Sequence, residues 1–207
     1  MESKRKKKKT FLKVISIIFI IILSLIAISH TVILVKAYDN YNKNVEIWKE
    51  YNYDGIIHDQ WDFEKLHYGF GDVGANGCGA VSVYNILKLE GRDADFPKII
   101  KQFDLVGENV FGIGGSKPSR VIRVLKSYGF NVSYTIKQSK FEEMAKNSKY
   151  SIFVYFGING LTPFGHYQLF YGFDGEKFTT INISGKYTFE EIINEPNTFF
   201  RMMICVN

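Results

Sequence analysis

A single cysteine stands between two glycines in the stretch GCGAVSVYNILKLEG, residues 77–91. After Cys78 the apolar residues recur at helical spacing, and Gly91 stands where such a helix would end. Partial positive charge at a helix N-terminus favours a thiolate and lowers the pKa of a cysteine. The flanking glycines would leave the backbone open to a substrate. Cys78 is therefore a candidate nucleophile, and the alternative is a buried cysteine that packs as a small hydrophobic side chain.

A cysteine nucleophile needs a base that takes its proton and a third group that orients the base. Of the four histidines, His30 lies in a long apolar stretch, and His58 and His67 lie in a polar segment. His166 opens the strand-like sequence GHYQLFYGF, so its ring can project from a sheet into a cleft. His166 is the candidate base, and the alternative is an ordinary exposed histidine at the start of a strand.

The candidate orienting group is Asn182, which follows His166 by sixteen residues in the strand-like sequence TTINIS. The sequence DGEK between the two strands predicts a hairpin turn. A turn centred near Gly175 would place positions 166 and 182 roughly opposite each other, within side-chain reach. Asn182 could then accept the imidazole hydrogen bond. The alternatives are a polar strand residue and a chance Asn-x-Ser sequon.

Helices followed by strands must position these residues. The sequences FPKIIKQFDL and SKPSRVIRVLKSYG predict two further helices, the first starting near Pro97 and the second with Pro118 in its first turn. Helices first and an antiparallel sheet afterwards is the α+β pattern. Aromatic and β-branched runs predict strands at 131–136, 150–158, 165–175, 177–184 and 199–206, with short helices at 140–148 and 187–195.

Residues 14–35 carry no formal charge over 22 residues, which is long enough to cross a bilayer as one helix. A basic run at 4–9 precedes this stretch and favours a cytoplasmic N-terminus with an extracytoplasmic remainder. Cleavage after Ala37, as in a signal peptide, is the alternative. We expect a cytoplasmic basic tail at 1–13, a signal-anchor transmembrane helix at 14–35, a stalk and lead-in at 36–66, and a catalytic domain at 67–207.

The composition argues against several classes of protein. The chain has 207 residues and a net charge of +5, but residues 1–13 hold seven of its 26 basic residues. The remainder carries 19 basic and 20 acidic residues and offers no basic face to a nucleic acid. Two cysteines are too few for a disulfide scaffold, and Cys205 lies in an apolar run that predicts core packing. The Gly-rich sequence at 112–119 lacks the Gly-Lys-Ser/Thr ending of a phosphate loop. We expect no nucleic-acid partner, no metal and no cofactor.

NGCGAVSVYNILKLEG, followed 88 residues after its cysteine by a Gly-His strand and then by an asparagine, resembles a known family. The family is that of papain-like cysteine peptidases related to bacteriocin double-glycine leader peptidases, the thirty-ninth family of cysteine peptidases. The resemblance covers about residues 68–207 and implies a papain-like fold. It implies Cys78 as nucleophile, His166 as general base and acid, and Asn182 as the orienting residue. The chain would be a membrane-anchored, standalone bacterial thiol peptidase, or a related acyl-transfer enzyme, acting on a peptide or protein.

One position departs from the family pattern. The family usually places a glutamine several residues before the cysteine, where its amide helps to stabilise the oxyanion, and here that region reads FGDVGAN. The nearest upstream glutamine is Gln60, eighteen residues before Cys78. We expect Asn76 or Asp72 to take its place beside the backbone N–H of Cys78. Loss of one oxyanion donor costs about 100- to 1000-fold in rate. A catalytically inactive domain that binds a peptide or an envelope partner is therefore the second hypothesis.

Overall fold

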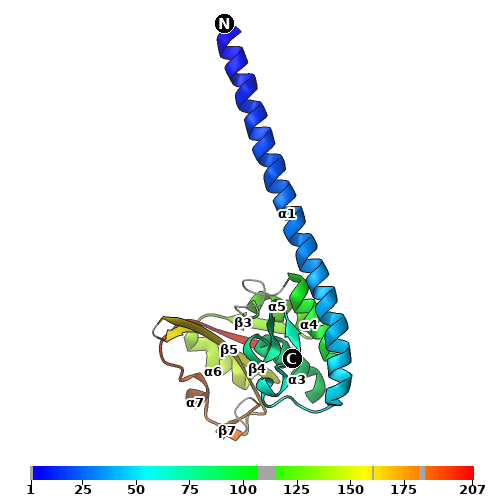
Figure 1. The fold of residues 1–207 in the computed structure, drawn as a ribbon. Coiled ribbons are helices and arrows are strands. Elements are labelled where there is room, and N and C mark those ends of the chain that lie inside the picture. The colour runs from blue at the N-terminus through cyan, green and yellow to red at the C-terminus, as the bar shows by residue number, and fades with distance from the viewer. Residues whose placement is uncertain (1, 107–114, 160, 182–184) are drawn as a thin grey trace. The chain divides into compact units, whose positions relative to one another are not determined.

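The chain divides into two compact units. The computed structural model describes residues 2–106, 115–159, 161–181 and 185–207 (Figure 1). Contacts within the chain separate Met1–Lys36 from Ala37–Asn207. Helix α1 (Glu2–Tyr51) contains the whole described part of the first unit and contributes its last turns to the second.

The first unit is an apolar helix. Nearly all the large apolar side chains from Val14 to Val35 are exposed, and an 18-residue window of this helix has a mean hydropathy of 2.8. A helix of this length and composition is able to span the apolar part of a bilayer.

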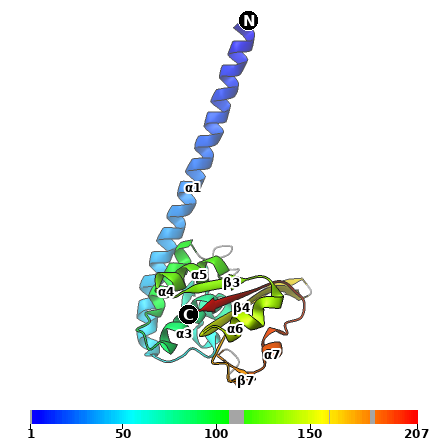
Figure 2. The ribbon, with the colours of Figure 1, turned by 180° about the vertical axis from the view of Figure 1, so that it is seen from behind.

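The second unit is an α+β domain built on an antiparallel sheet, as the order of elements in the sequence predicts (Figures 1 and 2). A small hairpin of β1 (His67–Tyr68) and β2 (Gly71–Asp72) precedes the main helices. The helices are α2 (Val73–Asn76), α3 (Cys78–Leu89), α4 (Phe96–Val106), α5 (Pro118–Ser127), α6 (Phe141–Lys146) and α7 (Phe189–Ile193), with 3-10 turns at η1 (Gln60–Phe63) and η3 (Gln138–Lys140).

The sheet has the strand order β3-β8-β4-β5-β6-β7, and all its described pairs are antiparallel. Its two longest strands form one hairpin, in which Tyr155 lies opposite His166. The strands are β3 (Val132–Thr135), β4 (Tyr150–Asn159), β5 (Thr162–Tyr171), β6 (Phe178–Thr180), β7 (Gly185–Tyr187) and β8 (Thr198–Val206).

Alternating side chains of the sheet enter two cores, as the two-residue period of a strand requires. On β4, Ile152 and Val154 pack with α3, α4 and α5, whereas Phe153 and Tyr155 pack with α6 and α7 on the other face. Cys205 is buried in the second core, which confirms the packing expected for it.

The helix expected at Cys78 is confirmed, because α3 begins at that residue and Gly91 follows its end with a φ of 64°. The hairpin register differs from the expectation. The ladder pairs Phe170 with Thr180, two residues away from the register that would place position 182 opposite His166. The DGEK sequence forms the expected turn, in which Oδ1 of Asp174 accepts hydrogen bonds from the backbone N–H groups of Glu176 and Lys177.

The segment expected to be a stalk packs into the second unit. Asn40 is fully buried on α1, and its Nδ2 donates to the Gly69 carbonyl (2.8 Å) and to Oδ2 of Asp104 (2.9 Å). One turn later, the Asn44 side chain exchanges two hydrogen bonds of 2.8 Å with the backbone of His67. The four-residue spacing puts both amides on one helix face, so this part of α1 is fixed to the domain by its own side chains.

Candidate active site

Cys78 owes its position to two glycines that permit close packing. A Cβ at Gly77 would lie 2.7 Å from the Val73 carbonyl oxygen, and a Cβ at Gly79 would lie 2.6 Å from Oγ of Ser116. Both glycines therefore make room for neighbouring protein atoms, which differs from the expected opening for a substrate. The α2–α3 junction can then turn sharply and place the cysteine at the first position of α3.

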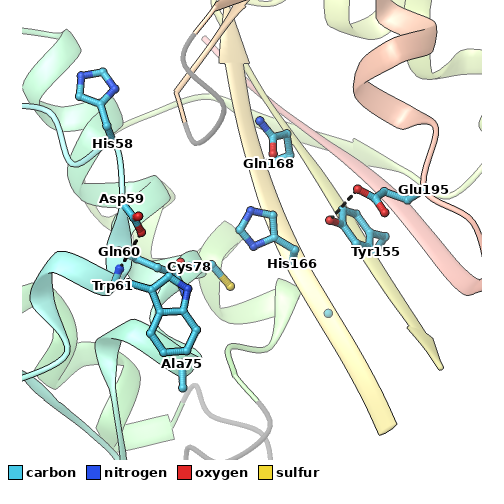
Figure 3. A pocket seen from close by; sticks show the side chains of 11 residues that line it. His58, Asp59, Gln60, Trp61, Ala75, Cys78, Tyr155, His166, Gln168 and Glu195 are labelled. Atoms are coloured by element: carbon cyan, nitrogen blue, oxygen red, sulfur yellow. Dashed lines mark hydrogen bonds between the residues drawn. The ribbon is translucent and has the colours of Figure 1, made fainter. Parts of the chain in front are cut away.

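A cleft of about 400 Å³ brings Cys78 and His166 together (Figure 3). His166 projects from β5, and Cys78 lies at the start of α3; both side chains line the cleft. The hydroxyl of Tyr155, the cross-strand neighbour of His166, donates to Oε1 of Glu195 (3.2 Å). The cleft is lined by His58, Asp59, Gln60, Trp61, Ala75, Cys78, Tyr155, Gly165, His166, Gln168 and Glu195.

Burial sets the charge state of this pair. The Cys78 side chain is almost completely buried, and desolvation raises the pKa of its thiol to about 11, although neighbouring backbone groups, chiefly that of Tyr167, act in the opposite direction. Desolvation lowers the pKa of His166 to about 4. At neutral pH the resting pair is therefore a thiol and a neutral imidazole. The thiolate expected from the helix N-terminus is disfavoured at rest, because desolvation outweighs the backbone groups that would stabilise it.

Gln60 lies in the same cleft, although the sequence separates it from Cys78 by eighteen residues. Its Nε2 donates one hydrogen bond to the Gly74 carbonyl (2.5 Å), and η1 is capped by Asp59, whose Oδ1 accepts from the Trp61 N–H (2.9 Å). The residues between η1 and α3 form the β1–β2 hairpin and α2, which fold back so that η1 contacts α2. The signal in the sequence was only indirect, because the family pattern usually places a glutamine several residues before the cysteine, whereas Gln60 precedes it by eighteen.

The structure places the two expected oxyanion residues elsewhere. Asp72 caps α2, where its Oδ1 accepts from the Ala75 N–H (2.8 Å). Nδ2 of Asn76 lies against Gly71, whose added Cβ would be 2.7 Å away. Neither residue lines the cleft. An ionised carboxylate also accepts hydrogen bonds only, so Asp72 could not stabilise an oxyanion.

Asn182 lies outside the described residues, and the third member of the expected triad is therefore not placed by this structure. Among the residues that are described, no group of three or more His, Cys, Asp and Glu side chains is arranged to hold a metal ion.

The chain is similar in structure, at low sequence identity, to solved peptidase domains. The peptidase domain of Streptococcus ComA, a bi-functional ABC transporter involved in a quorum sensing pathway, shares 14% identity at a TM-score of 0.43, over 62% of this chain and 89% of that one. The peptidase domain of Streptococcus mutans ComA in complex with a small-molecule inhibitor shares 12% identity at a TM-score of 0.39, over 64% of this chain and 93% of that one. Another structure of the peptidase domain of Streptococcus mutans ComA shares 13% identity at a TM-score of 0.35, over 64% of this chain and 92% of that one. No family model matches the sequence, and no curated protein matches it.

Proposed function

We propose that this chain is a membrane-anchored, papain-like thiol hydrolase that cleaves peptide or amide bonds with Cys78. The observation that carries the proposal is the meeting of Cys78, His166 and Gln60 in one cleft, from three segments that are far apart in the sequence. A nucleophile, a base and an amide donor are the groups that acyl transfer needs.

The reaction begins with a proton transfer on substrate binding, because the resting thiol and imidazole are both neutral. His166 takes the thiol proton as the Cys78 sulfur attacks the carbonyl carbon. The oxyanion accepts hydrogen bonds from the Cys78 backbone N–H and from the second hydrogen of Gln60 Nε2. His166 then gives the proton to the leaving amine, and a thioester remains. Water, deprotonated by His166, attacks the thioester, and the acid and the free thiol are released.

Asn182 is the proposed orienting residue for His166. An amide that holds the imidazole in one tautomer contributes less than the up to about 10,000-fold of the serine-protease precedent, because a thiol is more acidic than a serine hydroxyl. We expect Asn182→Asp to be largely active, Asn182→Ala to be impaired, and His166→Ala to be inactive. Full activity of Asn182→Ala would exclude this role.

The proposed location of the domain is outside the cytoplasm. The basic run before the apolar helix supports this orientation, with Lys4–Lys9 on the cytoplasmic side. The substrate would then be a peptide or protein in the extracytoplasmic space.

The second candidate function is a catalytically inactive domain that binds a peptide or an envelope partner. The raised pKa of Cys78 and the lowered pKa of His166 favour this alternative, because a neutral pair is a weaker nucleophile than a thiolate–imidazolium pair.

A covalent label distinguishes the two functions. The full-length protein in detergent is incubated with a peptidyl chloromethyl ketone, and the adduct is located by mass spectrometry. An enzyme forms the adduct at Cys78, His166→Ala slows it strongly, and Cys205→Ala leaves it unchanged. Absence of an adduct at Cys78, together with absence of turnover on a peptide library, would establish the inactive alternative.

A further inference from the structure

Two carboxylates face the candidate catalytic cleft from either side of Cys78 and His166. Asp59 and Glu195 both line it, and Figure 3 shows them at opposite ends of the view. In each carboxylate the described hydrogen bond engages one oxygen, because Oδ1 of Asp59 accepts from the Trp61 N–H and Oε1 of Glu195 accepts from the Tyr155 hydroxyl.

The cleft lining contains no lysine or arginine among the described residues, so its formal charge is negative at neutral pH. Arg201 contacts Glu195 but does not pair with its carboxylate. The Arg201 guanidinium donates to the Glu195 backbone carbonyl (2.6 Å) and to Oγ1 of Thr198 (2.6 Å). In the described part of the chain neither Asp59 nor Glu195 forms an ion pair.

An independent feature of the same cleft also indicates a ligand. Gln168 follows His166 by two residues on β5 and lines the cleft, and the residue is 5% exposed. Its Nε2 is buried and has no hydrogen-bond partner in the described structure. A buried donor without a partner costs about 1–3 kcal/mol, so native proteins retain few of them. A carbonyl oxygen of a bound peptide would supply the missing acceptor.

We propose that the cleft selects peptides that carry a positive charge near the scissile bond. Glu195 is the specificity-determining residue that receives this charge, and Gln168 donates to a backbone carbonyl of the same peptide. Glu195 is preferred over Asp59 because it is partly buried, whereas Asp59 is exposed and its charge is screened by solvent. The cation is either a lysine or arginine side chain or a free amino terminus. This inference rests on the proposed function, because it assigns the substrate class to the same cleft.

The test measures binding separately from turnover. Fluorescent peptides that differ only by arginine or its neutral isostere citrulline, each with a free or an acetylated amino terminus, are titrated into full-length Cys78→Ala protein in detergent. We expect the arginine peptide to bind about 10- to 100-fold more tightly than the citrulline peptide. If the amino terminus is the recognised cation, acetylation of the amino terminus weakens binding by this factor, and the change from arginine to citrulline does not.

Variants of the Cys78→Ala protein assign the effect to Glu195. Glu195→Gln should remove the preference for the positive charge, and Glu195→Arg should turn it into a preference for a glutamate peptide. Glu190→Gln is the matched control, because Glu190 is exposed on α7 and does not line the cleft. Gln168→Leu should weaken the binding of all the peptides to the same extent, whatever their charge.

The outcomes separate the inference from the proposed function. Charge-selective binding that depends on Glu195, without turnover by the wild type, would support the inference and contradict the proposed enzymatic function. Turnover of charged and neutral peptides at equal rates, with equal affinities, would overturn the inference and support the proposed enzymatic function. Unchanged binding by Gln168→Leu would overturn the role of that amide, and binding of no peptide at all would overturn the whole proposal.

Discussion

At the scale of single residues, burial favours the uncharged forms of the two reactive groups in the cleft, the Cys78 thiol and the His166 imidazole. Neither the Cys78 thiol nor the His166 imidazole ionises near neutral pH, because both lose more hydration than their neighbours replace. A substrate that brings hydrogen-bond donors and acceptors into the cleft would favour the charged forms.

This arrangement makes the stability of the fold depend on pH. The pKa of His166 is about 4 in the folded chain against its usual 6.5, so below pH 6.5 the unfolded chain binds a proton that the folded chain does not. Stability is fully present above pH 6.5 and falls as the pH falls toward 4. The loss is up to about 3 kcal/mol at about 1.4 kcal/mol per pH unit. The measurement is the thermal midpoint in detergent at pH 7, 5.5 and 4.5, for the wild type and His166→Gln.

His166→Gln keeps the other three histidines and should show a smaller fall of the midpoint over this pH range. The same pH dependence in the wild type and the variant would mean that His166 is not the group responsible.

Gln60 is expected to act on the transition state rather than on binding. Gln60→Ala removes the amide donor from the cleft, and we expect kcat to fall about 100- to 1000-fold with little change in KM. Gln138→Ala, on the 3-10 turn η3 outside the cleft, is the matched control. Steady-state kinetics and thermal melts are compared for both. A fall in kcat that follows a collapse of the melting temperature would instead assign Gln60 a structural role through its bond to Gly74.

At the scale of elements, the contact between α3 and Ser116 positions the nucleophile. The Ser116 carbonyl accepts a hydrogen bond from the Tyr167 hydroxyl (2.6 Å), and its Oγ bonds the Tyr68 hydroxyl (2.5 Å). The start of α3, the hairpin strand β1 and the His166 strand β5 therefore meet at one residue, and its neighbour across the contact is Gly79.

Gly79→Ala is expected to push these elements apart. The added Cβ would lie 2.6 Å from Oγ and 2.7 Å from Cβ of Ser116, and overpacking of this kind costs about 1–3 kcal/mol. We expect a lower melting temperature and slower labelling of Cys78. Ser116→Gly in the same chain removes both clashing atoms and should recover part of the packing loss. A double variant no more stable than Gly79→Ala would show that the clash is not the cause.

The elements themselves could largely be read from the sequence, because their hydrophobic periods and their glycine and proline boundaries are local signals. α3 at Cys78 and α5 at Pro118 were predicted in this way, and so was the existence of the His166 strand, although β5 begins at Thr162 and His166 lies within it rather than at its start. The pairing and packing of elements with one another were harder to predict from the sequence. The register of the β5–β6 hairpin depends on where the turn closes, and a shift of two residues keeps the same side chains on the same face.

The site shows the same limit. The helix position and the histidine strand are local features, but Gln60 reaches the cleft only because a hairpin and α2 fold back between it and Cys78. The end of α1 looked like a polar stalk because its buried side chains are amides. Asn40 and Asn44 pair with backbone groups and a carboxylate that the sequence places 23 to 64 residues away.

At the scale of the whole molecule, the boundary of the second unit is testable by truncation. A fragment of residues 37–207 keeps the amide contacts of Asn40 and Asn44 and should fold and melt cooperatively. A fragment of residues 52–207 loses the hydrogen bonds of Asn40 to Asp104 and to the Gly69 carbonyl, and it loses the packing of Ile47, Trp48 and Tyr51 against the first core. It should melt at a lower temperature or aggregate. Equal melting of the two fragments would show that the end of α1 contributes no stability.

The orientation of the chain decides which peptides the cleft could meet. The basic run at residues 4–9 precedes the apolar helix, and positively charged flanks are retained in the cytoplasm, so the second unit should lie outside. An impermeant protease added to intact cells should then remove the second unit and spare the basic tail, as followed with tags at the two ends. Replacing the six basic residues with glutamine should weaken this orientation and leave part of the protein protected, whereas replacing Lys137 and Lys140 in the second unit should not. A domain that is protected in intact cells and digested only after lysis would reverse the orientation and place the substrate in the cytoplasm.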